Sequence, residues 1–277
     1  MKDLAPLSLR RLSRRLKADF KASRNRHLSA QDVFTKVYIK GMWGGDPGTF
    51  FSGPGSNDEA ARPYADFVIQ FMTEHNVTSV VDLGCGDFRV GSLIAASGVS
   101  YTGVDVVEPL IAQNRRRHAG PIVRFQCADI TSDALPDGEL CLVREVFQHL
   151  SNAQVRAVLA RLAKYKFALI TEVHPEDLQH YQINRDKPHG ATSRLVHYSV
   201  LCLDHPPFNV ADARLVFEND PPQYTSYAVY GRSFKLRTFL ITGSDRRTSN
   251  RQHALDTAAV APRRAWSDDR VTPDLTA

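Results

Sequence analysis

The stretch Val80-Val81-Asp82-Leu83-Gly84-Cys85-Gly86-Asp87-Phe88 decides the fold of this chain. An apolar run leads into an acidic residue and then into two glycines separated by one residue. This order is typical of a buried strand that ends in a tight turn, because glycine tolerates positive φ and has no Cβ to keep a ligand away from the backbone. A helix beginning just beyond the turn would direct its free N–H groups and its positive dipole end at the same ligand. The stretch therefore predicts a ligand site at a strand end.

Strand-like and helix-like segments alternate on both sides of this turn. Apolar segments separated by stretches with helical spacing predict five strands, at residues 79–83, 101–105, 122–126, 140–143 and 167–173. A polar, loop-like region over 174–211 then leads to two more expected strands, at 213–217 and 236–241. The alternation predicts an α/β fold with a doubly wound parallel sheet, whose ligands bind at the carboxyl ends of the strands.

The charge of the chain is concentrated at its start. The net charge of the 277 residues is +5, but residues 1–27 alone hold nine Lys or Arg against two Asp. The body is therefore near neutral, whereas a nucleic-acid-binding domain would need a basic face on the body as well. We expect residues 1–27 to be a flexible arm. The alternatives are an amphipathic segment that makes weak contact with an anionic membrane or a polyanion, or a transit peptide.

The remaining composition indicates a cytoplasmic protein. No window approaches the roughly 20 apolar residues that span a bilayer, and the start of the chain lacks the apolar region of a secretory signal. The four cysteines form no C-x-x-C pair, so we expect reduced thiols and no metal site. Residues 28–57 are rich in aromatic residues and glycine, and they predict either a packed wrap or a lid over the turn. The expected domain spans 58–242, and the polar tail over 243–277 is expected to be disordered.

The spacing of acidic residues indicates a ligand that contains ribose. Asp105 ends the second expected strand 21 residues after Gly84, close to the spacing at which βαβ units present a carboxylate to ribose hydroxyls. Arg89 stands where a dinucleotide fingerprint has its third glycine, which counts against a dinucleotide. Asp129 and Ile130 follow the third expected strand. Three strand ends thus carry an acid.

The set Asp82-x-Gly84-x-Gly86, Asp105 and Asp129-Ile130 resembles the class I S-adenosylmethionine-dependent methyltransferases. The resemblance covers about residues 56–242 and implies a seven-stranded sheet whose last strand is antiparallel. It implies that the turn holds the methionine portion and the ribose, that Asp105 takes the ribose hydroxyls, and that Asp129 lies beside the adenine. The expected cofactor-binding residues are Trp43, Ser52, Gly53, Asp82, Gly84, Cys85, Gly86, Asp87, Asp105, Val106, Asp129, Ile130 and Arg144.

A narrower resemblance rests on motifs outside the turn. Trp43, the run Ser52-Gly53-Pro54-Gly55-Ser56, the segment 144–152 and Pro207-Phe208-Asn209 look like a group of bacterial methyltransferases associated with small molecules or surface glycans. That group usually has Asp where this chain has Glu145. The resemblance leaves the acceptor open.

Candidate catalytic residues are expected after the fourth and fifth strands. A hydroxyl nucleophile benefits from a base within hydrogen-bond reach, and His149 and His174 are the first candidates, with His180 and His197 in the loop region as further ones. Glu145 could hold the acceptor or the methionine amino group, and Arg144 could hold an anionic acceptor or pair with Glu172.

The motifs that are missing narrow the chemistry. The segment after the fourth strand lacks the Asn/Asp-Pro-Pro-Tyr/Phe motif of base-amino methylation and the Pro-Cys nucleophile of cytosine-carbon methylation. The sequence therefore predicts methyl transfer to an oxygen or nitrogen of a small molecule or glycan-like acceptor, and leaves the oligomeric state unknown. The alternatives are an NAD(P)-dependent oxidoreductase and a non-catalytic cofactor-binding protein that uses its basic arm to bind a partner.

Overall fold

The computed structural model describes residues 27–46, 48–220 and 233–243, together with Ser13, Leu16, Lys17, Asp19, Phe20, Ser23 and Arg24. Most of the predicted arm, and the predicted tail beyond Gly243, lie outside the described residues. Among the helices that the structure describes, none is both long enough and apolar enough to cross a membrane.

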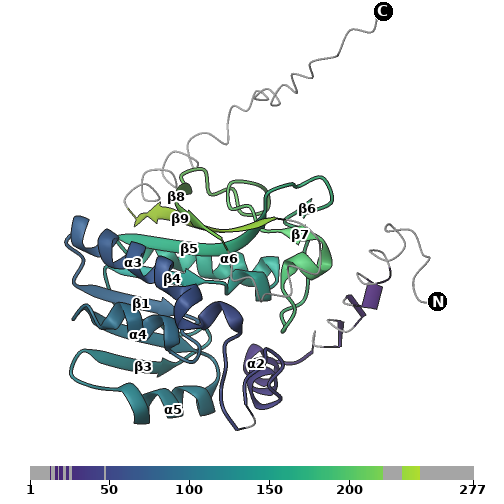
Figure 1. The fold of residues 1–277 in the computed structure, drawn as a ribbon. Coiled ribbons are helices and arrows are strands. Elements are labelled where there is room, and N and C mark those ends of the chain that lie inside the picture. Colours follow the sequence, from purple (N-terminus) through teal and green to yellow (C-terminus); the bar gives the residue numbers. More distant parts are fainter. Residues whose placement is uncertain are drawn as a thin grey trace, which may run out of the picture.

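A seven-stranded sheet forms the centre of the described chain (Figure 1). Its first five strands in sequence all run parallel, and only β9 is antiparallel to its neighbours β5 and β8. This arrangement confirms the predicted doubly wound α/β fold with an antiparallel last strand. In spatial order the strands are β3 (Val123–Cys127), β2 (Ser100–Asp105), β1 (Ser79–Leu83), β4 (Leu140–Arg144), β5 (Phe167–Pro175), β9 (Phe234–Thr242) and β8 (Arg214–Asn219).

Helices cover both faces of the sheet. One face packs against α3 (Asp58–Glu74) and α4 (Arg89–Ala95), and the other packs against α6 (Asn152–Arg161). Alternate residues of β1 explain the two layers: Val80 faces the first core and Val81 the second, as expected of a parallel strand that is buried on both sides. Two further helices complete the layers, α5 (Glu108–His118) beside β2 and β3, and the 3-10 turn η3 (Leu162–Lys164) after α6.

Local signals start and stop several of these helices. Ser151 caps α6 in a capping box with Gln154, as expected from its place before an amphipathic segment. Asn76 ends α3 in the left-handed conformation, with φ of 53°. Pro63 lies inside α3.

Strand β5 is longer than the sequence indicates. We predict its end at residue 173, but it continues through His174 and Pro175 because β9 pairs with it along its whole length, ending with Pro175 opposite Phe234. The third strand is also displaced, by one residue, to Val123–Cys127. The extension of β5 decides where His174 lies.

Several short elements lie over the carboxyl end of the parallel strands. The aromatic segment contributes α2 (Ala30–Ile39) and η1 (Pro54–Ser56). The predicted loop region 174–211 is more regular than expected, because it contains the parallel pair β6 (Gln182–Ile183) and β7 (Ser199–Val200) and the turn η4 (Arg194–His197). Figure 1 shows α2 and the β6–β7 pair at the same end of the sheet, where the turn η2 (Phe147–His149) follows β4.

Candidate active site

A cavity of about 640 Å³ lies at this end of the sheet. It is lined by the turn after β1, the ends of β2 and β4, the segment after β3, the aromatic segment, residues 191–193 and Val196. Every predicted cofactor-binding residue lines it, as do Glu145 and His149. The three strand-end acids therefore share one cavity.

The glycines of the turn are required by close contacts. Gly84 has φ of 84° and Gly86 has φ of 56°, a region that other residues rarely adopt. A Cβ on Gly84 would lie 2.4 Å from Cγ2 of Val146, and one on Gly86 would lie 2.3 Å from Oγ of Ser52. Side chains in place of these glycines would push apart the walls of the cavity.

Backbone and side-chain donors hold the two buried acids at this turn. Asp105 accepts hydrogen bonds from the backbone nitrogens of Gly86 (3.2 Å) and Val107 (3.1 Å). Asp82 accepts one from the Tyr101 hydroxyl. Burial raises the pKa of each carboxyl to about 6. Both carboxylates are thus oriented in advance and are ready to gain a donor or a cation from a ligand.

The acid after β3 is held by its own loop. Oδ1 of Asp129 accepts hydrogen bonds from the backbone nitrogen of Thr131 (2.8 Å) and from its hydroxyl (2.7 Å). The apolar side chains of Val106 and Ile130 line the same cavity. Apolar surfaces with a few fixed polar groups suit a flat heterocycle.

The aromatic segment is tied to the turn after β1 by Ser52. The Ser52 backbone nitrogen donates to Oδ2 of Asp87 (3.0 Å), and the Asp87 backbone nitrogen donates to Oγ of Ser52 (2.8 Å). The Tyr38 hydroxyl lies 2.9 Å from the same Oγ. Nε1 of Trp43 donates to the carbonyl of Ala191 (3.0 Å), which also lines the cavity. The segment is therefore bonded to two other parts of the cavity lining.

Arg144 and Glu145 pair with each other at the end of β4. The distance from Nη1 of Arg144 to Oε2 of Glu145 is 3.2 Å, and Nη2 of Arg144 donates to the carbonyl of Gly55. The expected alternative, a pair between Arg144 and Glu172, is wrong. Glu172 instead accepts from the backbone nitrogens of Phe147 and Gln148. Arg144 thus joins the aromatic segment to the loop after β4.

His149 faces the cavity as a neutral ring. Its Nδ1 lies 3.1 Å from the carbonyl of Gly190, and its ring lies 5.0 Å from that of Trp43. Burial is the main cause that lowers its pKa to about 3. A neutral ring that donates from Nδ1 has Nε2 as its accepting nitrogen. His149 can therefore accept a hydrogen bond, but it holds a proton poorly.

His174 does not reach the cavity. It lies inside β5, opposite Lys235 of β9, and it is 5% exposed with its ring against Phe239. Burial lowers its pKa to about 4. We expected it directly after the strand, but the pairing with β9 keeps it within the sheet. The structure therefore does not bring His174 together with the other candidates.

Sequence reasoning missed several residues of the cavity. Tyr38 and Tyr64 have the spacing of core residues on α2 and α3, and both line the cavity. Gln148, Thr192 and Val196 carry no local signal, because they enter the wall only through the packing of η2 and η4. The described residues contain no cluster of His, Cys, Asp and Glu that could hold a metal ion.

Comparison with known proteins supports a methyltransferase domain. Residues 80–165 match a family model described as "Methyltransferase domain". A search among curated proteins found no match.

Solved structures resemble the chain at low sequence identity. The N-methyltransferase NodS from Bradyrhizobium japonicum, solved with S-adenosylhomocysteine, is 13% identical (TM-score 0.49), and the match covers 74% of this chain and 97% of NodS. The 1,6-didemethyltoxoflavin-N1-methyltransferase from Burkholderia thailandensis is 18% identical (TM-score 0.48; 87% and 93% covered). The [4+2]-cyclase SpnF is 15% identical (TM-score 0.49; 76% and 93% covered). At these values the likeness concerns the fold.

The strand order and the matched family model both agree with the fold expected from the sequence. The order β3-β2-β1-β4-β5-β9-β8 with one antiparallel strand is the Rossmann-like methyltransferase arrangement that the resemblance implies. The match over residues 80–165 contains the turn, Asp105, Asp129 and the loop after β4. The predicted methyltransferase fold is thereby confirmed, and S-adenosylmethionine is the cofactor that the resemblance to the class I enzymes implies.

Proposed function

We propose that this protein transfers the methyl group of S-adenosylmethionine to an oxygen or nitrogen of a small-molecule or glycan-like acceptor. The observation that carries the proposal is the convergence of Asp82, Asp105 and Asp129 with the Gly84–Gly86 turn on one cavity of about 640 Å³. S-adenosylmethionine supplies a methyl group on a sulfonium, a leaving group that needs no protonation. The protein's tasks are therefore alignment and exclusion of water.

The residues at the β1–β2–β3 side fit the cofactor. We assign the ribose hydroxyls to Asp105, whose carboxylate is buried and already aimed by two backbone donors. Val106 and Ile130 offer apolar faces to the adenine, and Asp129 offers an acceptor for its amino group. Asp82, close to Arg144 and oriented by Tyr101, lies at the methionine end.

The residues at the β4 side are assigned to the acceptor. β4 neighbours β1 on the side opposite to β2, so the loop after β4 lies beyond the turn that we assign to the methionine portion. Glu145, Gln148, His149 and Thr192 give this end carboxylate, amide, imidazole and hydroxyl groups, and Trp43 gives it an aromatic wall. Polar groups around an aromatic face suit a hydroxyl-rich or amine-containing molecule.

Calorimetry with S-adenosylhomocysteine, NAD and NADP tests the cofactor assignment. Binding of S-adenosylhomocysteine alone is expected, whereas binding of NAD or NADP alone would support an oxidoreductase. A screen of alcohols, phenols, sugars and primary amines, read out as release of S-adenosylhomocysteine, then tests the reaction. Cofactor binding without turnover of any of these acceptors would contradict the proposed acceptor class.

A further inference from the structure

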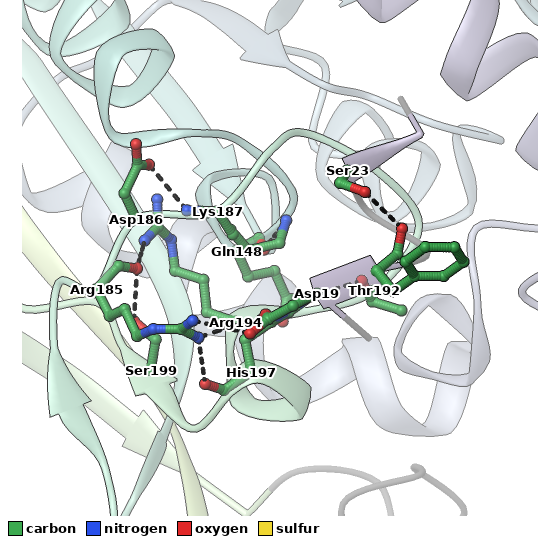
Figure 2. Close-up of polar contacts among 11 residues, drawn as sticks. Asp19, Ser23, Gln148, Arg185, Asp186, Lys187, Thr192, Arg194, His197 and Ser199 are labelled. Carbon is green, nitrogen blue, oxygen red and sulfur yellow. Dashed lines mark hydrogen bonds and ion pairs between the residues drawn. The ribbon is translucent and has the colours of Figure 1, made fainter. Parts of the chain in front are cut away.

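A second polar cluster lies behind the wall of the cavity, and it includes a residue of the N-terminal arm. Asp19 lies beside Arg185 and His197, as Figure 2 shows. The Asp19 carboxylate is 2.7 Å from Nδ1 of His197 and 2.8 Å from Nη2 of Arg185. His197 is fully buried. The arm that we expected to be flexible is thus in contact with the body at Asp19.

The other nitrogen of the same imidazole reaches the cavity wall. Nε2 of His197 lies 3.0 Å from Oγ1 of Thr192. Thr192 lines the cavity together with Ala191, Ser193 and Val196, whereas His197 does not line it. A continuous chain of hydrogen bonds therefore runs from Asp19 through His197 to the hydroxyl of Thr192.

The direction of these hydrogen bonds follows from the carboxylate. The hydrogen bonds from Arg185 and His197 outweigh its burial and hold the pKa of Asp19 below its ordinary value, so the carboxylate is ionised and can only accept. Nδ1 of a neutral His197 must then carry the proton, and Nε2 must accept one from the Thr192 hydroxyl. Because that proton is engaged, the Thr192 oxygen has only lone pairs to offer the cavity.

We propose that Thr192 is a catalytic residue that receives the proton of the acceptor's nucleophile, with His197 and Asp19 as the positioning residues behind it. This inference rests on the proposed methyl transfer. The nucleophile forms a bond to the methyl carbon as the sulfur–carbon bond breaks, and that electron pair stays on sulfur. The proton of the nucleophile moves to Oγ1 of Thr192, while the hydroxyl proton of Thr192 moves to Nε2 of His197.

The charges balance in this step. The positive charge lost from the sulfonium ends on the His197 imidazolium, where the partly exposed Asp19 carboxylate stabilises it, as in other histidines backed by an acid. His149 is the less suitable proton acceptor. It is bound through Nδ1 to a carbonyl and not to a carboxylate, and its pKa is lowered to about 3. In our assignment His149 contacts the acceptor without holding its proton.

Imidazole nitrogen NMR on the full chain, with and without S-adenosylhomocysteine, tests the hydrogen-bond chain without any acceptor. We expect His197 to be neutral at pH 7 with its proton on Nδ1, since burial and the neighbouring Lys187 and Arg185 charges lower its pKa despite Asp19. In the Thr192→Val variant, the resonance of Nε2 of His197 should move, whereas Nδ1 of His197 should stay protonated. A proton on Nε2, or no change in Thr192→Val, would overturn the proposal.

Kinetics with the acceptors from the screen test the catalytic role. Thr192→Val should lower kcat at least 100-fold and leave the Kd of S-adenosylhomocysteine within twofold, and Thr192→Ser should restore most of the rate. Asp19→Asn should lower kcat and shift the acidic limb of the pH profile to lower pH, an effect that a merely structural contact would not produce. Thr73→Val, an exposed threonine of α3, is the matched control and should match the wild type.

The outcomes separate this inference from the proposed function. Wild-type kcat in Thr192→Val, with cofactor binding and turnover intact, would overturn the role of Thr192 and leave methyl transfer standing. Failure of the wild type to bind S-adenosylhomocysteine would overturn both, whatever the state of His197.

Discussion

The Glu172 carboxylate of β5 lies 2.7 Å from the backbone nitrogen of Phe147, in the loop that follows β4. It also accepts from the backbone nitrogen of Gln148, at 3.2 Å. On the other side of this loop, the buried Arg194 guanidinium donates to the carbonyls of Phe147 and Leu150. One buried acid and one buried base thus hold the segment that presents Glu145 and His149 to the cavity.

Glu172→Ala is expected to lower the free energy of unfolding by about 2–4 kcal/mol, because it leaves two buried N–H groups without an acceptor. Urea denaturation measures the change. Glu172→Gln keeps an acceptor oxygen and should lower the free energy of unfolding by less. Glu176→Ala, at an exposed position just beyond the same strand, is the control and should change the free energy of unfolding by no more than about 0.5 kcal/mol. Equal stability of Glu172→Ala and the wild type would show that water replaces these hydrogen bonds.

Asp105→Ala is expected to weaken binding of S-adenosylhomocysteine by about 1.5–3 kcal/mol, the value of a charge-assisted hydrogen bond. This corresponds to roughly a 10- to 150-fold rise in Kd by calorimetry. Asp66→Ala, at an exposed position of α3, is the control and should bind like the wild type. An unchanged Kd in Asp105→Ala would exclude the ribose contact.

Binding of S-adenosylhomocysteine should weaken as the pH falls from 7 to 5. Burial raises the pKa of Asp82 and Asp105 to about 6, so these carboxyls take up protons in this range and must release them to accept the ligand's donors. We expect Kd to rise about 10- to 100-fold, since each such proton contributes up to tenfold per pH unit below 6.

The stability of the unliganded protein should respond to pH in the opposite direction. A carboxyl whose pKa is raised on folding stabilises the folded protein at low pH, where it is protonated. This stabilisation is lost as the pH rises through 6. Calorimetry across this range measures both effects, and Asp105→Asn should flatten the dependence of Kd. A Kd that stays constant from pH 5 to 7 would contradict the role of these two acids.

Gly86→Ala should reduce binding of S-adenosylhomocysteine at least tenfold, a change of about 1.4 kcal/mol. The new Cβ would lie 2.3 Å from Oγ of Ser52 and would break the contact between the turn and the aromatic segment. Gly98→Ala is the matched control: it also has positive φ, 86°, but nothing lies within 4 Å of the added carbon. If both variants lose the same affinity, backbone strain is the cause and the loss of the contact with Ser52 is not.

Much of the cofactor half of the site could be predicted because its signals are local. An apolar run, a strand-end acid and glycines that need positive φ stand next to one another at 80–88, and each next acid follows its own strand. The acceptor half could be predicted only in part. Glu145 and His149 follow the fourth strand, but Gln148 and Thr192 carry no local signal and line the cavity only through the packing of the fold.

The sequence by itself determined the alternation of strands and helices and the acids at the ends of β1, β2 and β3, because hydrophobic periodicity and turn chemistry act over a few residues. The tertiary structure decided the placement of His174, since the length of β5 depends on its pairing with β9. The tertiary structure also decided the chain of hydrogen bonds that runs from Asp19 through His197 to Thr192. These residues lie up to 178 positions apart, and only the tertiary contacts of Asp19 and Thr192 with His197 of η4 bring them within hydrogen-bond distance.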